Sequence, residues 1–280
     1  MVKYDDLVDM HIHTTASDGS WGSEELIDKV KQAGVSLMAI SDHDSVSNVL
    51  EVSRYAKRAG INFIYGVEIS STYNNELFHI LGYGMDLNNN ELKQLIDNNS
   101  KMMERKDDDS IRLLIKNGYD ISFEEYERYE NNNSRGGWKT LNFLIDKGFC
   151  KDVNDFFGTL FCGNNKIPYP EFPHSKDVIE TIKKAGGVPV LAHPMYGLSK
   201  LSLEEMLPLF MTMGISGIEC YHPHHSKEIS KKCVDWCNEN DMIITAGSDC
   251  HGDFIKARKI GKPEVTYKEI RLKELEVKIL

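Results

Sequence analysis

Residues 7–41 read LVDMHIHTTASDGSWGSEELIDKVKQAGVSLMAIS, and this stretch decides the fold. It opens with an apolar run at residues 7–13, continues into residues 23–33, whose apolar positions have helical spacing, and returns to an apolar run at 36–41. Strand, helix and strand in this order form the unit of a parallel sheet, because the helix carries the chain back across the sheet face. The sequence therefore predicts an α/β architecture from its first forty residues.

The same alternation continues along the chain. Further strands are predicted at residues 62–70, 76–83, 188–192, 217–221 and 242–246, and helices at 46–59, 175–184, 202–213 and 226–240. This many units favour a barrel over an open sheet. Residues 88–173 break the rhythm with a long polar helix at 91–117 and a shorter one at 139–148. We predict a barrel built from residues 1–87 and 174–280, with residues 88–173 inserted as a helical cap at one end.

Composition narrows the class of partner. The 280 residues carry 33 basic and 43 acidic side chains, a net charge of −10, which excludes a broad basic surface for duplex nucleic acid. An anionic substrate must then be attracted by something local, such as bound metal ions. The N-terminal residues do not resemble a secretory signal, and no apolar run has the length of a membrane span, so we expect a cytoplasmic protein without a membrane partner. The six cysteines show no paired framework, and we assign them no function.

Histidine and carboxylate side chains follow nearly every predicted strand. Alternate residues of a strand share a face, so His11 and His13 should point together, as should Asp249 and His251. Catalytic groups of barrel enzymes gather at the carboxyl ends of different strands, so these side chains are expected to converge. The candidate metal ligands are His11, His13, Asp18, His43, Glu68, His79, His193, Asp249 and His251.

Each of these residues has an ordinary explanation when it is taken alone. A histidine at a strand end is usually just hydrogen-bonded, and an aspartate there often caps a helix. The set has no such explanation, because packing gives no reason to collect imidazoles in one place. Imidazole with carboxylate suits Mn²⁺, Fe²⁺ or Zn²⁺ better than Mg²⁺. Nine ligands exceed what one ion uses, so two or three divalent ions are predicted, and Glu68 is placed to bridge two of them. Asp9, Asp42 and Asp44 are expected to orient the ligating imidazoles.

The order of these motifs resembles the polymerase and histidinol phosphatase (PHP) family. The resemblance covers about residues 7–85 and 186–261 and rests on His11-x-His13, Ser17-Asp18-Gly19, Ser41-Asp42-His43-Asp44, Glu68, Ala192-His193-Pro194 and Ser248-Asp249-x-His251. It implies a distorted (β/α)7 TIM-like barrel whose trinuclear metal centre hydrolyses phosphoesters through a metal-bridging hydroxide. By the same resemblance the first ion would be held by His11, His13, Glu68 and Asp249, the second by Glu68, His79 and His193, and the third by Asp18, His43 and His251.

The insertion resembles that of bacterial members acting on nucleoside 3′,5′-bisphosphates and short RNA 5′ ends. Those members usually carry an Arg-Pro-His motif, whereas this chain has Arg135-Gly136-Gly137-Trp138. Arg135 suits bidentate phosphate binding, and Trp138 either stacks on a base or anchors the cap. The family's His-Ser pair points to His225 as a phosphate ligand or proton donor, although a helix-capping loop would also explain it. His222 is a further candidate substrate contact. The predicted catalytic residues are Asp18, Arg135 and His225.

The sequence thus predicts a metal-dependent phosphoesterase, a hydrolase acting on the phosphomonoester of a small nucleotide-like substrate or a short oligonucleotide. One alternative is a histidinol-phosphate-type phosphatase. Another is a metal-dependent amidohydrolase, whose barrel also uses a His-x-His pair but generally carries a carboxylated lysine where Glu68 stands here. A binding module without activity is disfavoured, because every expected ligand position is filled.

Overall fold

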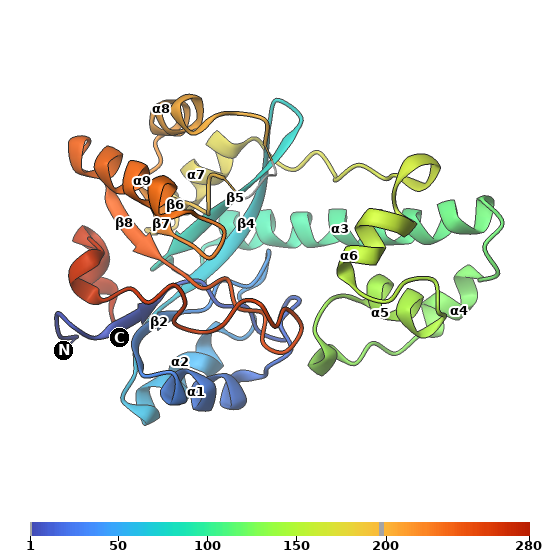
Figure 1. Ribbon diagram of the computed structural model, residues 1–280, viewed down its shortest axis with the longest axis horizontal. Helices are drawn as coiled ribbons and strands as arrows, with labels where there is room; N and C mark the ends of the chain where they lie inside the picture. Colours follow the sequence, from blue (N-terminus) through green and yellow to red (C-terminus); the bar gives the residue numbers. More distant parts are fainter. Residues whose placement is uncertain (1, 196–198) are drawn as a thin grey trace.

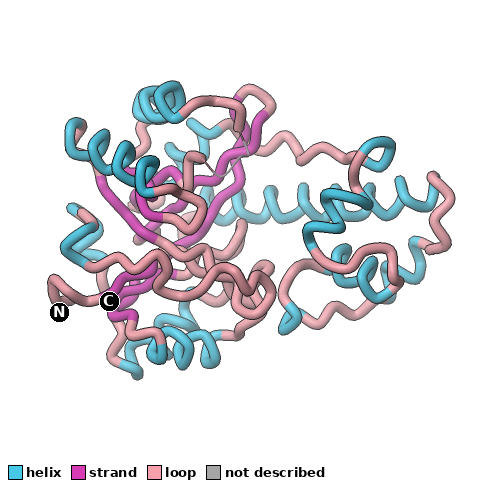
Figure 2. Tube along the Cα trace, in the orientation of Figure 1, coloured by secondary structure: helices cyan, strands magenta, loops and turns pink. Residues whose placement is uncertain are grey.

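The structure is a computed structural model that describes residues 2–195 and 199–280. It has an α/β fold in which helices surround two sheets (Figures 1 and 2). The first sheet has three parallel strands in the order β1-β2-β3, connected by two helices. Its elements are β1 (Leu7–Asp9), α1 (Ser23–Gln32), β2 (Val35–Ala39), α2 (Val49–Ala59) and β3 (Asn62–Ile64).

The second sheet has five strands in the order β4-β5-β6-β7-β8. Strand β5 is antiparallel to both of its neighbours, while β6, β7 and β8 are parallel to one another. The β4–β5 hairpin turns at Asn74 and Asn75, both with positive φ, a conformation that asparagine tolerates well. The elements are β4 (Gly66–Tyr73), β5 (Glu76–Tyr83), α7 (Ser175–Lys184), β6 (Val188–Leu191), α8 (Leu203–Met213), β7 (Gly217–Tyr221), α9 (Lys227–Glu239) and β8 (Ile243–Ala246).

The α/β class is confirmed, whereas the described strands do not form one closed parallel barrel. The predicted strand 62–70 is two strands in different sheets, separated only by Tyr65. Gly66 makes this change possible, because a Cβ there would lie 2.4 Å from the carbonyl oxygen of Ile40. The sheets meet just beyond the ends of β1 and β2, where Met10 N donates to Ala246 O at 2.9 Å and Glu68 N to Asp42 O at 3.2 Å. The predicted ligands lie at this meeting point.

Residues 90–165 form a helical lobe to one side of the sheets (Figure 1). It contains α3 (Asn90–Lys116), α4 (Phe123–Arg128), α5 (Lys139–Asp146) and α6 (Val153–Asp155). The start of α3 packs Leu92 and Ile96 into the core of the five-stranded sheet, whereas the lobe has an apolar cluster of its own that includes Leu114, Leu141 and Phe156. None of the helices in the described ranges is both long enough and apolar enough to cross a membrane.

Candidate metal centre

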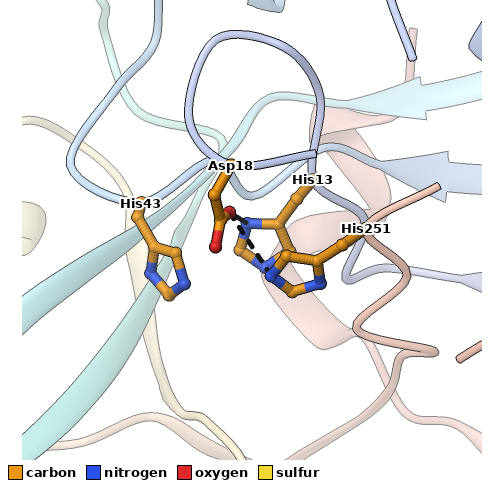
Figure 3. A group of neighbouring side chains, drawn as sticks. All are labelled: His13, Asp18, His43 and His251. Atoms are coloured by element: carbon orange, nitrogen blue, oxygen red, sulfur yellow. Dashed lines mark ion pairs between the residues drawn. The ribbon is translucent and has the colours of Figure 1, made fainter. Parts of the chain in front are cut away.

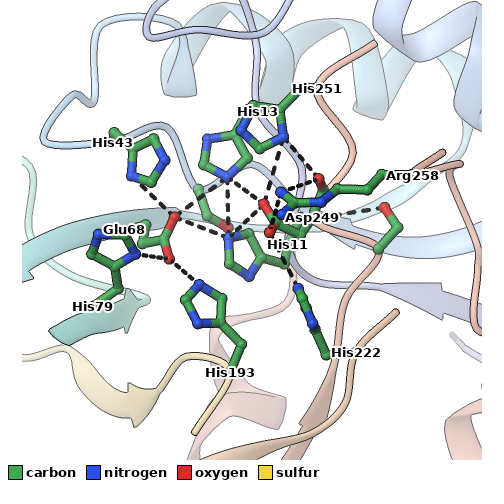
Figure 4. Close-up of polar contacts among 12 residues, drawn as sticks. His11, His13, His43, Glu68, His79, His193, His222, Asp249, His251 and Arg258 are labelled. Atoms are coloured by element: carbon green, nitrogen blue, oxygen red, sulfur yellow. Dashed lines mark hydrogen bonds and ion pairs between the residues drawn. The ribbon is translucent and has the colours of Figure 1, made fainter. Parts of the chain in front are cut away.

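Glu68 lies at the centre of the site, fully buried on β4, with imidazoles around both of its carboxylate oxygens (Figure 4). Its Oε1 is 2.8 Å from His193 Nε2 and 3.0 Å from His79 Nδ1. Its Oε2 is 3.1 Å from both His11 Nε2 and His43 Nδ1. One carboxylate thus contacts histidines from four segments of the chain, because His13 Nε2, 3.4 Å from Oε2, belongs to the same segment as His11.

The predicted ligands assemble into three groups whose donor atoms lie within 4.8 Å of one another. One of them, drawn in Figure 3, is built on loops and includes Asp18, whose Oδ1 is 3.3 Å from His251 Nε2 and 3.7 Å from His13 Nδ1. We call this group the loop group. The three groups are His13, Asp18, His43 and His251; His11, His13, Glu68 and Asp249; and His43, Glu68 and His79.

These groups differ in detail from the three sets that the family resemblance implies. The His11, His13, Glu68 and Asp249 group is the same in both. His13 additionally joins the loop group, and His43 stands beside Glu68 and His79 where His193 was expected. His193 remains adjacent, at 2.8 Å from Glu68 Oε1. The structure therefore brings all nine predicted residues into one cluster.

The donor chemistry of this cluster fits cations. His11 Nδ1 lies 2.9 Å from Glu219 Oε1, so a neutral imidazole donates its one proton there and turns the lone pair of Nε2 toward Glu68 Oε2 and His13 Nε2, each 3.1 Å away. His251 repeats the pattern, because its Nδ1 is 2.8 Å from the carbonyl oxygen of Asp249 and its Nε2 faces a carboxylate. Acceptors that face acceptors at this distance need a proton or a metal ion between them.

Burial and opposite charge pull the pKa values of these groups in opposing directions. Burial disfavours the charged form of His13, but hydrogen bonds with Asp249 and Glu68 outweigh it and raise its pKa to about 10. Burial likewise opposes ionisation of Glu68 and Asp249, yet the charge of His11 holds both carboxyl pKa values well below their usual range. Burial lowers the pKa of His43 to about 3. The cluster thus binds protons where a cation would otherwise sit, so metal ions compete with protons for it.

Backbone conformation at the site departs from the usual regions. His193 (φ 52°), Asp249 (φ 51°) and Asp44 (φ 44°) all lie in the left-handed region, which residues other than glycine rarely adopt. Such strain persists only where the surroundings fix it, and it concentrates at functional sites.

The expectation that Asp9, Asp42 and Asp44 orient imidazoles was wrong. Their hydrogen bonds go to backbone amides, hydroxyl groups and one side-chain amide. Asp42 and Asp44 flank His43 in the sequence, whereas Asp9, two residues before His11, accepts from the backbone N–H groups of Ser248 and Gly261. They hold the loops in place, and the orienting role falls to Glu219, which sequence reasoning missed.

Asp249 divides its two carboxylate oxygens between different partners. Oδ1 faces the cluster, 3.1 Å from His13 Nε2. Oδ2 pairs with the guanidinium of Arg258 and lies 3.2 Å from His222 Nε2. Because His222 Nδ1 accepts from the backbone N–H of His224, its Nε2 carries the proton and donates to Asp249. His222, a predicted substrate contact, therefore faces a candidate ligand.

The two ring nitrogens of His225 have different surroundings. Its Nδ1 is 3.1 Å from the carbonyl oxygen of Cys220, and its Nε2 is buried without a hydrogen-bond partner among the described residues. Burial lowers the pKa of this imidazole, which keeps it neutral at pH 7. The loop around His225 precedes α9, whose N-cap is Ser226 rather than the histidine itself.

The two predicted substrate residues of the lobe occupy different surroundings. Arg135 is about one-third exposed and pairs with Asp146 Oδ2 at 2.8 Å and the hydroxyl of Tyr129 at 3.1 Å. Trp138 packs on Phe156, another residue of the lobe, with ring centroids 5.2 Å apart.

Glu219 and Arg258 are two buried charged residues that contact predicted ligands and that we did not predict from the sequence. A signal existed for Glu219, because it is the one charged residue in the apolar strand Gly217–Tyr221 and alternation turns it toward the interior. Arg258 lies in an irregular loop, where no periodicity indicates burial.

The sequence of this chain is similar to that of a known protein family and of several characterised proteins. The PHP domain family matches residues 9–157. The chain is 27% identical over 245 residues to a 5′-3′ exoribonuclease of Haemophilus influenzae, covering 87% of this chain and 89% of that protein. It is 25% identical over 279 residues to a phosphoribosyl 1,2-cyclic phosphate 1,2-diphosphodiesterase of Eggerthella lenta, covering 90% and 97%. It is 27% identical over 260 residues to a 3′,5′-nucleoside bisphosphate phosphatase of Chromobacterium violaceum, covering 92% and 91%.

Proposed function

We propose, from the premise that this chain belongs to the PHP domain family, that it is a metal-dependent phosphoesterase acting on the phosphomonoester of a small nucleotide-like substrate. The observation that carries the proposal is the set of acceptor atoms facing one another around Glu68, Asp249 and Asp18. Nine ligands with this chemistry suit two or three ions of Mn²⁺, Fe²⁺ or Zn²⁺.

We assign the proposed ligands around Glu68 to three ions. His11, His13 and Asp249 would hold one ion with it, His79 and His193 a second, and Asp18, His43 and His251 a third. When bound, such ions polarise a phosphoryl oxygen and lower the pKa of water, as in two-metal phosphoester hydrolysis. They would also give an acidic chain a local positive charge that attracts phosphate.

The remaining candidate residues would bind and orient the substrate. His225 presents a buried Nε2 with no described hydrogen-bond partner, which suits a contact to a phosphate oxygen or a proton transfer to the leaving alcohol. Arg135 would bind a phosphate after exchanging Asp146 for it. Trp138 is proposed as a structural anchor of the lobe rather than a base-stacking platform, because its ring packs on Phe156 and Phe157.

The alternatives have less support. The amidohydrolase alternative generally requires a carboxylated lysine, and Glu68 occupies that place. No relative described above is named for histidinol phosphate. The relatives named for nucleoside bisphosphate and RNA favour a nucleotide-like substrate, and the one named for a cyclic phosphate makes a diester the nearest competitor.

The architecture supports a matching proposal for the domains. The two sheets would be the halves of a distorted seven-unit barrel, joined through the backbone contacts of Met10 and Glu68. Residues 88–173 would be an inserted cap, since most of this segment builds an apolar cluster separate from those of the sheets.

Phosphate release from adenosine 3′,5′-bisphosphate, measured with the Mn²⁺-loaded protein, tests the proposal. We expect turnover that EDTA abolishes and that His193→Ala reduces by several orders of magnitude. Turnover of histidinol phosphate alone would move the activity to the alternative phosphatase. Absence of metal-dependent hydrolysis of every phosphoester supplied, cyclic phosphates included, would contradict the proposal.

A further inference from the structure

The helical lobe contacts each of the loops that carry the loop group. Asp18 lies in the irregular segment after β1, His43 after β2 and His251 after β8, so these ligands lie outside the named strands, and His43 forms an isolated bridge with Glu68. By contrast, Glu68 belongs to β4, and Asp249 is bonded through its backbone N–H to His11 O. Isolated backbone bonds, and not strand ladders, thus join these loops to the sheets, and contacts from the lobe add to these bonds.

The first contact is made by two glycines of the lobe. Gly137 N donates to the carbonyl oxygen of Asp18 at 2.7 Å. Gly136 and Gly137 both have positive φ, and a Cβ on Gly136 would lie 2.4 Å from Phe254 Cβ, while one on Gly137 would lie 2.9 Å from Leu141. Only glycine allows the lobe to come this close to the Asp18 loop.

The second contact comes from α3. Asn99 is fully buried, and its Nδ2 donates to Asp44 Oδ1 and to Ser70 O, each at 2.8 Å. Asp44 follows His43 directly and also accepts from Ser70 N at 3.2 Å. The side chain of Asn99 therefore ties the loop of His43 to both the lobe and β4.

The third contact is apolar. Phe254, three residues after His251, packs against the apolar cluster of the lobe rather than those of the sheets. Every ligand loop that contributes to the loop group is thus fastened to the lobe, through Gly137, Asn99 or Phe254.

We propose that docking of the helical lobe completes the metal site of Asp18, His43 and His251, so that the lobe sets the affinity of this one ion. The affinity of the ion at His11, His13, Glu68 and Asp249 does not depend on the lobe. The inference rests on the proposed function only in assuming that the cluster binds metal. Its physical basis is that ligands on loops outside the strand ladders must be ordered further when the ion binds, and this ordering costs free energy. A docked lobe already orders these loops, so less free energy is lost when the ion binds.

Mn²⁺ stoichiometry and affinity, measured by calorimetric titration and by elemental analysis after desalting, test the inference with two matched pairs of variants. Asn99→Ala removes the contact to Asp44, and Asn98→Ala changes its exposed neighbour on the same helix. Gly137→Ala strains the contact to Asp18, and Gly148→Ala adds the same side chain at another positive φ in the lobe, where no atom lies within 4 Å. Circular dichroism reports whether each variant is folded.

After desalting, we expect Asn99→Ala and Gly137→Ala to retain one ion fewer than the unmodified chain. In the titration, the ion of the loop group should bind about tenfold more weakly, because each variant loses one or two buried hydrogen bonds. The controls should retain every ion, and the remaining ions of the two variants should keep their affinity. Equal binding by all five proteins would overturn the inference, as would a proportional loss of every ion. If the unmodified chain bound no ion at all, the proposed function itself would fail.

Discussion

Glu219 Oε1 lies 2.9 Å from Nδ1 of His11, with both side chains fully buried between the two sheets. Gly247 leaves room for the pair, because a Cβ there would lie 2.1 Å from His11 Cβ and 2.6 Å from Glu219 Oε1. The contact fixes the ring orientation and the tautomer of His11, so that Nε2 faces the metal cluster. A carboxylate behind a ligating imidazole also raises its basicity.

Replacing Glu219 should therefore weaken metal binding although it touches no ion. We expect Glu219→Ala to reduce Mn²⁺ affinity by about 10–100-fold, and Glu219→Gln by less, because an amide oxygen still accepts from Nδ1. Competition with a chromophoric chelator measures the affinity, with the exposed Glu239→Gln as the control. Unchanged affinity in Glu219→Ala would show that His11 needs no orienting partner.

Removing the metal ions should make the melting temperature of the protein fall as the pH rises above 7. The folded-state pKa of His13 is raised to about 10 from its ordinary 6.5. Protonated His13 therefore stabilises the metal-free fold fully below about pH 6.5, and this contribution is lost as pH rises through 10. We expect the melting temperature of EDTA-treated protein to fall between pH 7 and 10, and that of Mn²⁺-loaded protein to fall less, because the ions replace the protons.

Scanning fluorimetry across this pH range measures both curves. His13→Asn should flatten the metal-free curve, since it removes the titrating group. A metal-free melting temperature that stays constant from pH 7 to 10 would contradict the linkage to His13.

Arg258 should be needed for folding of the metal-free protein. Its guanidinium pairs with Asp249 Oδ2, and both side chains are buried. Removing one partner of a buried ion pair leaves an uncompensated charge, so Arg258→Ala should lower the free energy of unfolding by about 3 kcal/mol. Urea denaturation measures the loss, with the exposed Arg105→Ala as the control. An effect no larger than that of the control would mean that Arg258 is dispensable for holding Asp249.

Substitutions of Arg135 and of Asp146 should change the KM for substrate in opposite directions. The ion pair between them is partly exposed to solvent, so breaking it changes the free energy of unfolding by less than about 1 kcal/mol. If Arg135 binds substrate phosphate, Arg135→Ala should raise KM about tenfold without loss of metal, whereas Asp146→Ala should lower KM by releasing the guanidinium. Steady-state kinetics and elemental analysis measure the two effects. An unchanged KM in both variants would limit Arg135 to its contacts with Asp146 and Tyr129.

The sequence predicted the elements more successfully than their assembly. The strands 76–83 and 217–221 and the helix 175–184 have the predicted limits, because apolar periodicity and turn residues mark their ends. The separation of β3 from β4 was missed. It depends on the close approach of Gly66 to Ile40, a contact between distant residues that no local pattern encodes.

The convergence of the predicted ligands followed from strand alternation and the position of each residue at a strand end. His11 and His13 face the same cluster for this reason. The supporting residues were harder to predict, because Asn99 and Arg258 act from a polar helix and an irregular loop. Their roles depend on which distant backbone they contact, and the sequence carries that information only through the complete fold.

Binding of divalent ions by this cluster of imidazoles and carboxylates is the property from which the other proposals follow. Anomalous diffraction at the manganese edge, from crystals of protein loaded with Mn²⁺, tests it most directly. We expect two or three peaks, one of them between Glu68 and Asp249, each surrounded by nitrogen and oxygen atoms of the three ligand groups. A cluster without any anomalous peak at saturating Mn²⁺, and again at saturating Fe²⁺ and Zn²⁺ at their own edges, would contradict it.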